Sequence, residues 1–115
     1  MPTIVIRLDP AKLQNPDLDL RYDIPDMLAE RSGGLIADGG YDYETAGDAM
    51  HIYLRASDVS AALPHVLSLI ETERVHDNAL APAAQVGVSE ADAENAVEFR
   101  VVYPLGAAGV IRGRP

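Results

Sequence analysis

Two hydrophobic periodicities alternate along the chain, and their order limits the fold more than any other feature of the sequence. Apolar residues recur at every second position in residues 3–9, 49–57 and 96–104, which is the pattern of half-buried β-strands. In residues 57–74 they recur at spacings of three and four, which predicts a helix with one apolar stripe. The stripe consists of Val59, Ala62, Leu63, Val66, Leu67 and Ile70.

Less regular segments predict the remaining elements. Residues 34–44 read as a strand interrupted at Gly39 and Gly40, and residues 83–89 as a further strand. Asn15 followed by Pro16 is a favourable helix start, because asparagine caps the first turn and proline suits its first position.

A proline lies within each of the two predicted helical regions. Pro25 lacks a backbone donor and disfavours a helical Ile24, so we expect two short pieces, 16–23 and 25–32, meeting at a kink. Gly33 supplies the left-handed stop. Pro64 predicts a loose first turn in the second helix, with regular geometry from about Ser60.

The element order is therefore β-α-β-β-α-β-β. It predicts an α+β fold, a ferredoxin-like two-layer sandwich with a mostly antiparallel sheet and two helical segments on one face. The 115 residues suit a single domain, 1–115, with 105–115 as a flexible C-terminal tail. The expected core comprises Ile4, Ile6, Ile52, Leu54, Leu63, Val66, Leu67, Ile70, Phe99 and Val101.

Composition restricts the partner and the compartment. The formal net charge is −9, which opposes binding to nucleic acid and to anionic membranes and favours a basic protein partner. No apolar run approaches the roughly 20 residues of a membrane helix. The segment MPTIVIRLDPAKL lacks the basic region and cleavage site of a signal peptide. Together with the absence of cysteine, these features predict a cytoplasmic protein.

The sequence contains no recognisable catalytic or metal-binding motif. His51, His65 and His76 lack the spacing of a zinc site, and the carboxylates near the glycines do not follow the calcium-loop pattern. No serine lies in a G-x-S-x-G turn, and neither RSGG nor DGG has the context of a phosphate-binding loop. We therefore predict no metal, no cofactor and no catalytic residue.

The first candidate site is the segment 17–44, which carries eight carboxylates and three of the five tyrosines. Tyrosines offer amphipathic contact area at low entropic cost, and carboxylates among them suit an arginine- or lysine-rich partner. The alternative is that the tyrosines cover the edge of the core and the acids keep the surface soluble. The candidate partner-binding residues are Asp17, Asp19, Tyr22, Asp23, Asp38, Tyr41, Asp42 and Tyr43.

The second candidate site is the sheet face opposite the expected core. Strand alternation places basic and aromatic side chains there, which would suit an anion or a stacked base. The simpler interpretation is cross-strand pairing of the arginines with Asp42, Glu44 or Glu98. An open sheet face would also permit a homodimer. The candidate residues are Arg7, His51, Tyr53, Arg55 and Arg100.

The segments LDLRYDIPDMLAERSGG, GGYDYE and DVSAALPHVLSLIETERVHDNAL together resemble small acidic bacterial immunity proteins of polymorphic-toxin systems. The likeness lies in the general layout of residues 3–104. It implies a non-enzymatic protein that occludes a basic partner through an acidic, tyrosine-bearing surface. Two alternatives remain open: a ferredoxin-like small-molecule-binding or regulatory domain, and a small cofactor-free enzyme using His51 with Tyr53 or Arg55 in a sheet-face pocket.

Overall fold

A computed structural model describes residues 1–16, 19–44, 48–104, 106 and 109–113. The main sheet has six strands: β1 (Thr3–Leu8), β2 (Ile36–Tyr43), β3 (Met50–Ala56), β6 (Ala84–Ser89), β7 (Glu98–Tyr103) and β8 (Val110–Arg112). The two α-helices are α1 (Leu20–Arg31) and α2 (Val59–Thr72). Short pieces complete the described fold: 3-10 turns η1 (Pro10–Lys12) and η2 (Ala81–Ala83), and a hairpin of β4 (Arg74–Val75) and β5 (Asn78–Ala79).

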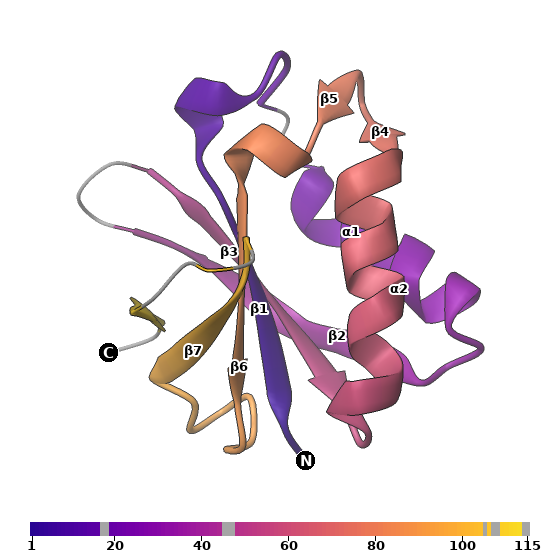
Figure 1. The fold of residues 1–115 in the computed structure, drawn as a ribbon, viewed down its shortest axis with the longest axis vertical. Helices are drawn as coiled ribbons and strands as arrows, with labels where there is room; N and C mark the ends of the chain where they lie inside the picture. The colour runs from indigo at the N-terminus through magenta and orange to yellow at the C-terminus, as the bar shows by residue number, and fades with distance from the viewer. Residues whose placement is uncertain (17–18, 45–47, 105, 107–108, 114–115) are drawn as a thin grey trace.

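The sheet order is β2-β3-β1-β6-β7-β8, with every described pair antiparallel. β3 is inserted between β1 and β2, as a split β-α-β unit requires. Both helices cover the same side of the sheet (Figure 1). The predicted α+β two-layer architecture is confirmed, and the sheet is extended at one edge by β7 and β8.

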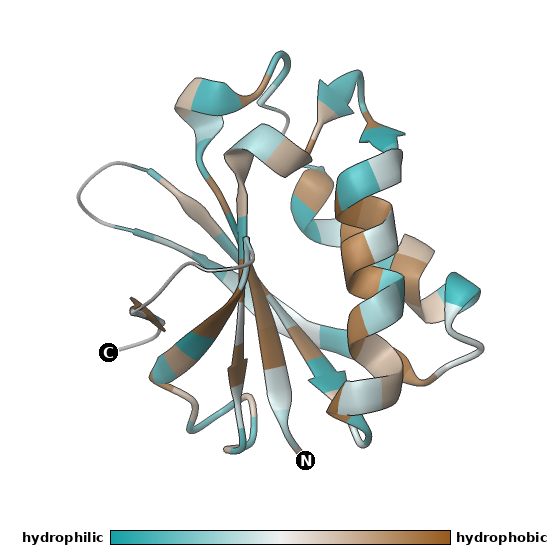
Figure 2. Ribbon diagram, viewed as in Figure 1, coloured by the Kyte–Doolittle hydropathy of each residue, from teal (hydrophilic) through white to brown (hydrophobic). Residues whose placement is uncertain are grey.

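The larger core lies between the helices and the sheet, where apolar segments of α2, β1 and β6 face the interior (Figure 2). Alternate residues of β1 and β3, such as Ile4 and Leu54, are fully buried there. α2 starts at Val59, one residue before the expected start, because Asp58 caps it by accepting from the Ala61 amide at 3.1 Å.

The stripe of α2 also differs from the prediction in one place. Leu69 is fully buried, whereas Leu63 and Leu67 are only partly buried at the border of the core. The predicted stripe included Leu63 and Leu67 but not Leu69. The helix instead presents Ala62, Val66, Leu69 and Ile70 as its buried set.

The expected kink in the first helical region is wrong: α1 is one continuous helix with Pro25 inside it. Leu20, Ile24 and Leu28 are all buried, so their packing outweighs the hydrogen bond that Pro25 cannot donate. The Gly33 stop is confirmed by its φ of +64° and by the bond from Gly34 N to Ala29 O at 2.9 Å.

Asn15 does not cap α1, which begins after Asp19. It joins the β4–β5 hairpin instead. Its amide N donates to Asn78 Oδ1 at 2.6 Å, and the Asn78 side chain donates back to the Asn15 carbonyl at 2.6 Å. Since Asn78 is fully buried, this exchange fixes the chain between η1 and α1.

A second, smaller core occupies the face that the sequence analysis expected to be open. It contains Val5, Tyr53, Ala96, Phe99 and Ile111. The sheet curls enough that an added Cβ at Gly113, just past β8, would lie 2.9 Å from the hydroxyl of Tyr53 on β3. Residues 110–112, expected in a flexible tail, form the edge strand that closes this core.

This second core changes the faces of β7. Phe99 and Val101 pack with Val5 and Tyr53 instead of with the helices. Arg100 pairs in register with Val88, a residue of the helix-side core, so Arg100 belongs to the helix side. Its expected place beside Arg7 and His51 is therefore wrong. A register shift at Val86 and Gly87 then returns Tyr103 to the helix-side core.

Candidate functional site

A glycine bulge in β2 decides which face each residue of the first candidate site occupies. Asp38 pairs with Leu54 and Tyr41 with Ile52, so Gly39 and Gly40 together oppose Tyr53. A Cβ at Gly39 would lie 3.1 Å from the Tyr53 backbone, and Gly40 has a φ of +97°. The backbone of Gly40 thus favours glycine, and a side chain at Gly39 would press against the Tyr53 backbone.

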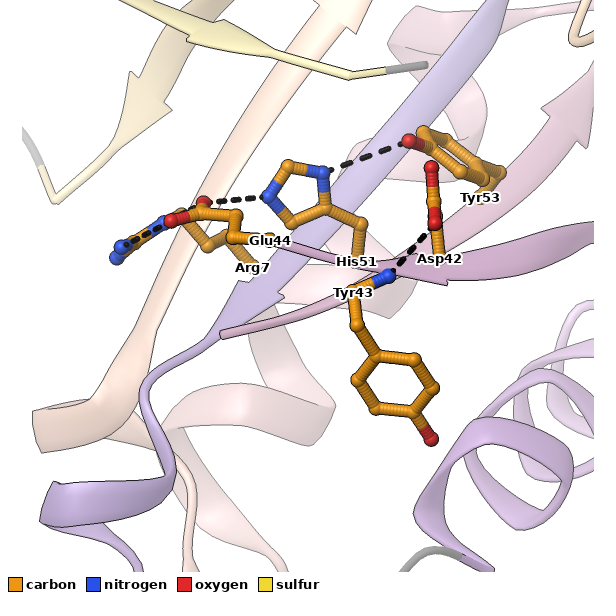
Figure 3. Close-up of polar contacts among 6 residues, drawn as sticks. All are labelled: Arg7, Asp42, Tyr43, Glu44, His51 and Tyr53. Carbon is orange, nitrogen blue, oxygen red and sulfur yellow. Dashed lines mark hydrogen bonds and ion pairs between the residues drawn. The ribbon is translucent and has the colours of Figure 1, made fainter. Parts of the chain in front are cut away.

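The bulge shifts the strand by one residue and thereby turns two tyrosines towards α1. Tyr41 and Tyr43 lie on the helix side, and Asp42 and Glu44 lie on the opposite face. Figure 3 shows the ring of Tyr43 pointing away from Asp42, Glu44 and His51. The segment 17–44 therefore does not form one surface, and Asp42 is separated from the tyrosines.

The three tyrosines gather around one arginine, and we call Arg21, Tyr22, Tyr41 and Tyr43 the tyrosine cluster. The rings of Tyr22 and Tyr41 meet edge to face with centroids 5.9 Å apart, and those of Tyr41 and Tyr43 do the same. The Arg21 Cζ lies 4.6 Å from the Tyr22 centroid and 4.8 Å from that of Tyr41.

Arg21 holds the cluster together. Its Nη1 donates to the hydroxyl of Tyr43 at 3.2 Å, while its guanidinium contacts the other two rings. Hydrogen bonding to Arg21 lowers the pKa of Tyr22, and contact with Tyr22 raises the pKa of Tyr41. Tyr22 and Tyr41 remain 45% and 41% exposed. The cluster is thus an ordered aromatic surface at the outer edge of the sheet.

The acidic candidate residues are distributed around α1. Asp19 and Asp38 are exposed on the same two elements that carry the tyrosines. Asp23 is directed towards the turn between β4 and β5, where it pairs with His76. Together with Asp26 and Glu30 it lines a cavity of about 360 Å³ between α1 and β4. Asp17 lies outside the described residues.

Asp26 and Glu30 are exposed carboxylates of α1 that the sequence analysis did not name as candidate site residues. Asp26 follows Tyr22 by about one helical turn and Glu30 by about two, along the exposed side of α1. The signal was present, because residues three or four apart share one face of a helix. The expected break at Pro25 concealed it by assigning these residues to a separate piece.

On the opposite face of the sheet, Arg7, Glu44, His51 and Tyr53 form a polar row that we call the Glu44 network (Figure 3). Arg7 binds the Glu44 carboxylate through Nε at 2.6 Å and Nη2 at 3.1 Å. His51 Nε2 lies 2.7 Å from Glu44 Oε2, and its Nδ1 lies 3.4 Å from the Tyr53 hydroxyl. The pairing of Arg7 with Glu44 agrees with the simpler of the two interpretations.

The Glu44 network is largely closed. His51 is 2% exposed and Tyr53, a member of the second core, is 0% exposed, so the two groups with catalytic potential are both buried. Arg55, expected beside them, is exposed and binds Glu94 at 2.6 Å. The second candidate site is thus reduced to Arg7, His51 and Tyr53, joined by Glu44.

Acid titration should reveal this network. Arg7, and to a smaller degree His51, lower the pKa of Glu44 to about 2. A lowered folded-state pKa stabilises the protein above the unfolded value of about 4.5, and this contribution disappears as the pH falls from about 4.5 to 2. Glu44→Gln should therefore cost about 1–3 kcal/mol at pH 7 and almost nothing near pH 2.

The measurement is urea unfolding at a series of pH values. Glu90→Gln, at an exposed position in the β6–β7 loop, is the matched control and should follow the parent throughout. A Glu44→Gln penalty that stays constant from pH 7 to pH 2 would show that the carboxylate charge does not stabilise the fold.

Among the described residues, no three histidine or carboxylate side chains are grouped as metal ligands would be. Within the same residues, no helix combines the length and apolarity that a bilayer span requires. Comparisons with protein-family models, with curated proteins and with solved structures find no match for this chain.

Proposed function

We propose that this protein is a non-enzymatic binding protein whose tyrosine cluster docks a basic partner protein. The main supporting observation is that Tyr22 and Tyr41 are both exposed and yet pack against Arg21. The Arg21 Cζ lies 4.6 and 4.8 Å from the centroids of their rings. Aromatic side chains that are already ordered lose little entropy on binding, which is the property of interface anchors.

The charge around the cluster supports a basic partner. The chain carries a net charge of −9, and Asp19, Asp26 and Asp38 are exposed close to the tyrosines in sequence and on the same elements. An acidic rim steers a cationic protein towards the aromatic centre and disfavours anionic competitors. Binding is favoured over catalysis because His51 and Tyr53 are closed off by the second core.

The specific form of this proposal is an immunity protein. Occlusion of a basic active site by an acidic, tyrosine-bearing surface would neutralise a toxin without any chemistry by this chain. The partner to test is the product of the gene adjacent to this one, because immunity proteins are often encoded beside their toxins.

Binding kinetics of this pair should separate the tyrosines from the acids. Tyr41→Ala should raise the dissociation rate roughly tenfold or more, because a central aromatic anchor is lost. Asp38→Lys should mainly slow association and weaken its salt dependence, because exposed charges act through steering. Circular dichroism checks that each variant folds.

Two control variants lie away from the cluster. Val110→Ala removes an exposed apolar side chain from β8, at the far edge of the sheet from β2, and Glu90→Lys makes the same charge change in the β6–β7 loop. Both should bind like the parent. If Tyr41→Ala and Asp38→Lys also bind like the parent, or if the neighbouring product does not bind, the proposed function is wrong.

A further inference from the structure

We propose that the tyrosine cluster selects arginine side chains of the partner over lysine, by stacking guanidinium groups on Tyr22 and Tyr41. This inference rests on the proposed function and specifies the chemistry of the partner. The proposed contact is with the parts of Tyr22 and Tyr41 that remain exposed to solvent while Arg21 packs against both rings.

The protein already contains the contact that we propose. Arg21 lies over both rings at 4.6 and 4.8 Å, well within the roughly 6 Å range of a cation–π interaction. Two rings at an interplanar angle of 84° present surfaces in two directions. Tyr22 and Tyr41 remain 45% and 41% exposed, so a guanidinium approaching from solvent can reach both residues.

Two exposed carboxylates, Asp26 and Asp38, lie near the two rings along α1 and β2. Asp26 follows Tyr22 by four residues on α1, so the two side chains are neighbours on one helix face, and both are exposed. Asp38 precedes the bulge on β2 and uses Oδ1 to accept the Gly40 amide at 2.8 Å. Its Oδ2 can accept from a partner. A planar guanidinium can stack on a ring and bind a carboxylate at the same time.

Lysine would gain less at this surface. Its ammonium is a strongly hydrated point charge without a planar face, so stacking on tyrosine costs more desolvation and gives no parallel contact. The positive charge of Arg21 does not prevent a second cation from binding, because the surrounding acids and the net charge of −9 keep the surface anionic. Acidic and neutral apolar ligands lack the complementary charge.

Two blocked peptides of equal charge test the inference: one with three arginines separated by glycines, and the same sequence with lysines. Titration calorimetry gives the affinities, and NMR reports the tyrosine ring signals. We expect the arginine peptide to bind about two- to fivefold more tightly, as an exposed cation–π contact implies, and to shift the Tyr22 and Tyr41 signals. Both peptides should weaken equally with added salt.

Variants connect the preference to the rings. Tyr41→Phe keeps the aromatic face and should keep the arginine preference, whereas Tyr41→Leu keeps apolar area and should reduce it. Val110→Ala is the control on the opposite edge of the sheet. Equal affinity of the parent for the two peptides, or an arginine preference unchanged in Tyr41→Leu, would overturn the inference.

These experiments distinguish failure of the arginine preference from failure of the proposed function. If the adjacent gene product binds and depends on Tyr41, but the two peptides bind alike, the docking function stands and arginine selection is wrong. If the peptides are discriminated while the adjacent product does not bind, the arginine preference stands and the proposed function is wrong.

Discussion

Replacing Phe99 by alanine should lower the free energy of unfolding by about 3–5 kcal/mol, because the change empties the centre of the second core. Phe99 is fully buried and stacks on Tyr53 with ring centroids 5.8 Å apart and an interplanar angle of 28°. Val5 and Tyr53 lie on β1 and β3, two adjacent interior strands of the sheet, which limits how far they can move to fill the space. Small domains have total stabilities of about 5–15 kcal/mol, so the loss is severe.

Urea unfolding followed by circular dichroism measures this change. Val97→Ala is the matched control: it lies two residues earlier, is 49% exposed, and should change stability by no more than about 0.5 kcal/mol. A loss below about 1 kcal/mol for Phe99→Ala would mean that β7 and β8 do not close over the sheet in solution. The face bearing Arg7 and His51 would then be open after all.

Leu69→Ala should be nearly as damaging, with a loss of about 2–5 kcal/mol. Leu69 is 0% exposed in the helix-side core, at the interface of α2 with the sheet. Leu67→Ala is the matched comparison in the same helix, because the residue type is the same and only the burial differs. Leu67 is partly exposed at the border of the core, so we expect roughly half the loss or less.

The pair of leucine variants tests the orientation of α2. If Leu67→Ala costs more than Leu69→Ala, the helix is rotated about its axis relative to the structure, and the stripe expected from the sequence alone is the right one. Thermal and urea unfolding should rank the two variants in the same order.

The local elements were predictable from the sequence because short-range patterns determine them. Alternation in β1 and β3, the helical spacing in α2, and the stop at Gly33 all act within a few residues of one another. The glycine interruption at Gly39 and Gly40 was also recognisable, and it is the feature that later positions the tyrosines. These patterns, in their order along the chain, were sufficient for the two-layer α+β architecture.

Contacts distant in sequence decided what the patterns could not. α1 continues through Pro25 because Leu20, Ile24 and Leu28 are buried against the sheet. This packing energy comes from residues distant in sequence, so local sequence patterns do not predict it. The side of the sheet on which Phe99 is buried depended on whether β7 and β8 curl back over β1 and β3. Alternation of apolar residues separates the two faces of a strand, but it does not show which face the rest of the chain covers. The Phe99 and Arg100 assignments were both wrong for this one reason.

The candidate sites divide in the same way. The sequence by itself determined that tyrosines and carboxylates concentrate in residues 17–44, that the net charge is −9, and that arginines and a histidine occur at alternate positions along the strands. Only the tertiary structure decided that the bulge turns Tyr41 and Tyr43 towards Tyr22, that Arg21 lies over the rings of Tyr22 and Tyr41, and that His51 is buried beside Glu44. The physical reason is that side-chain type is local, whereas exposure depends on which strands and helices the whole chain brings together.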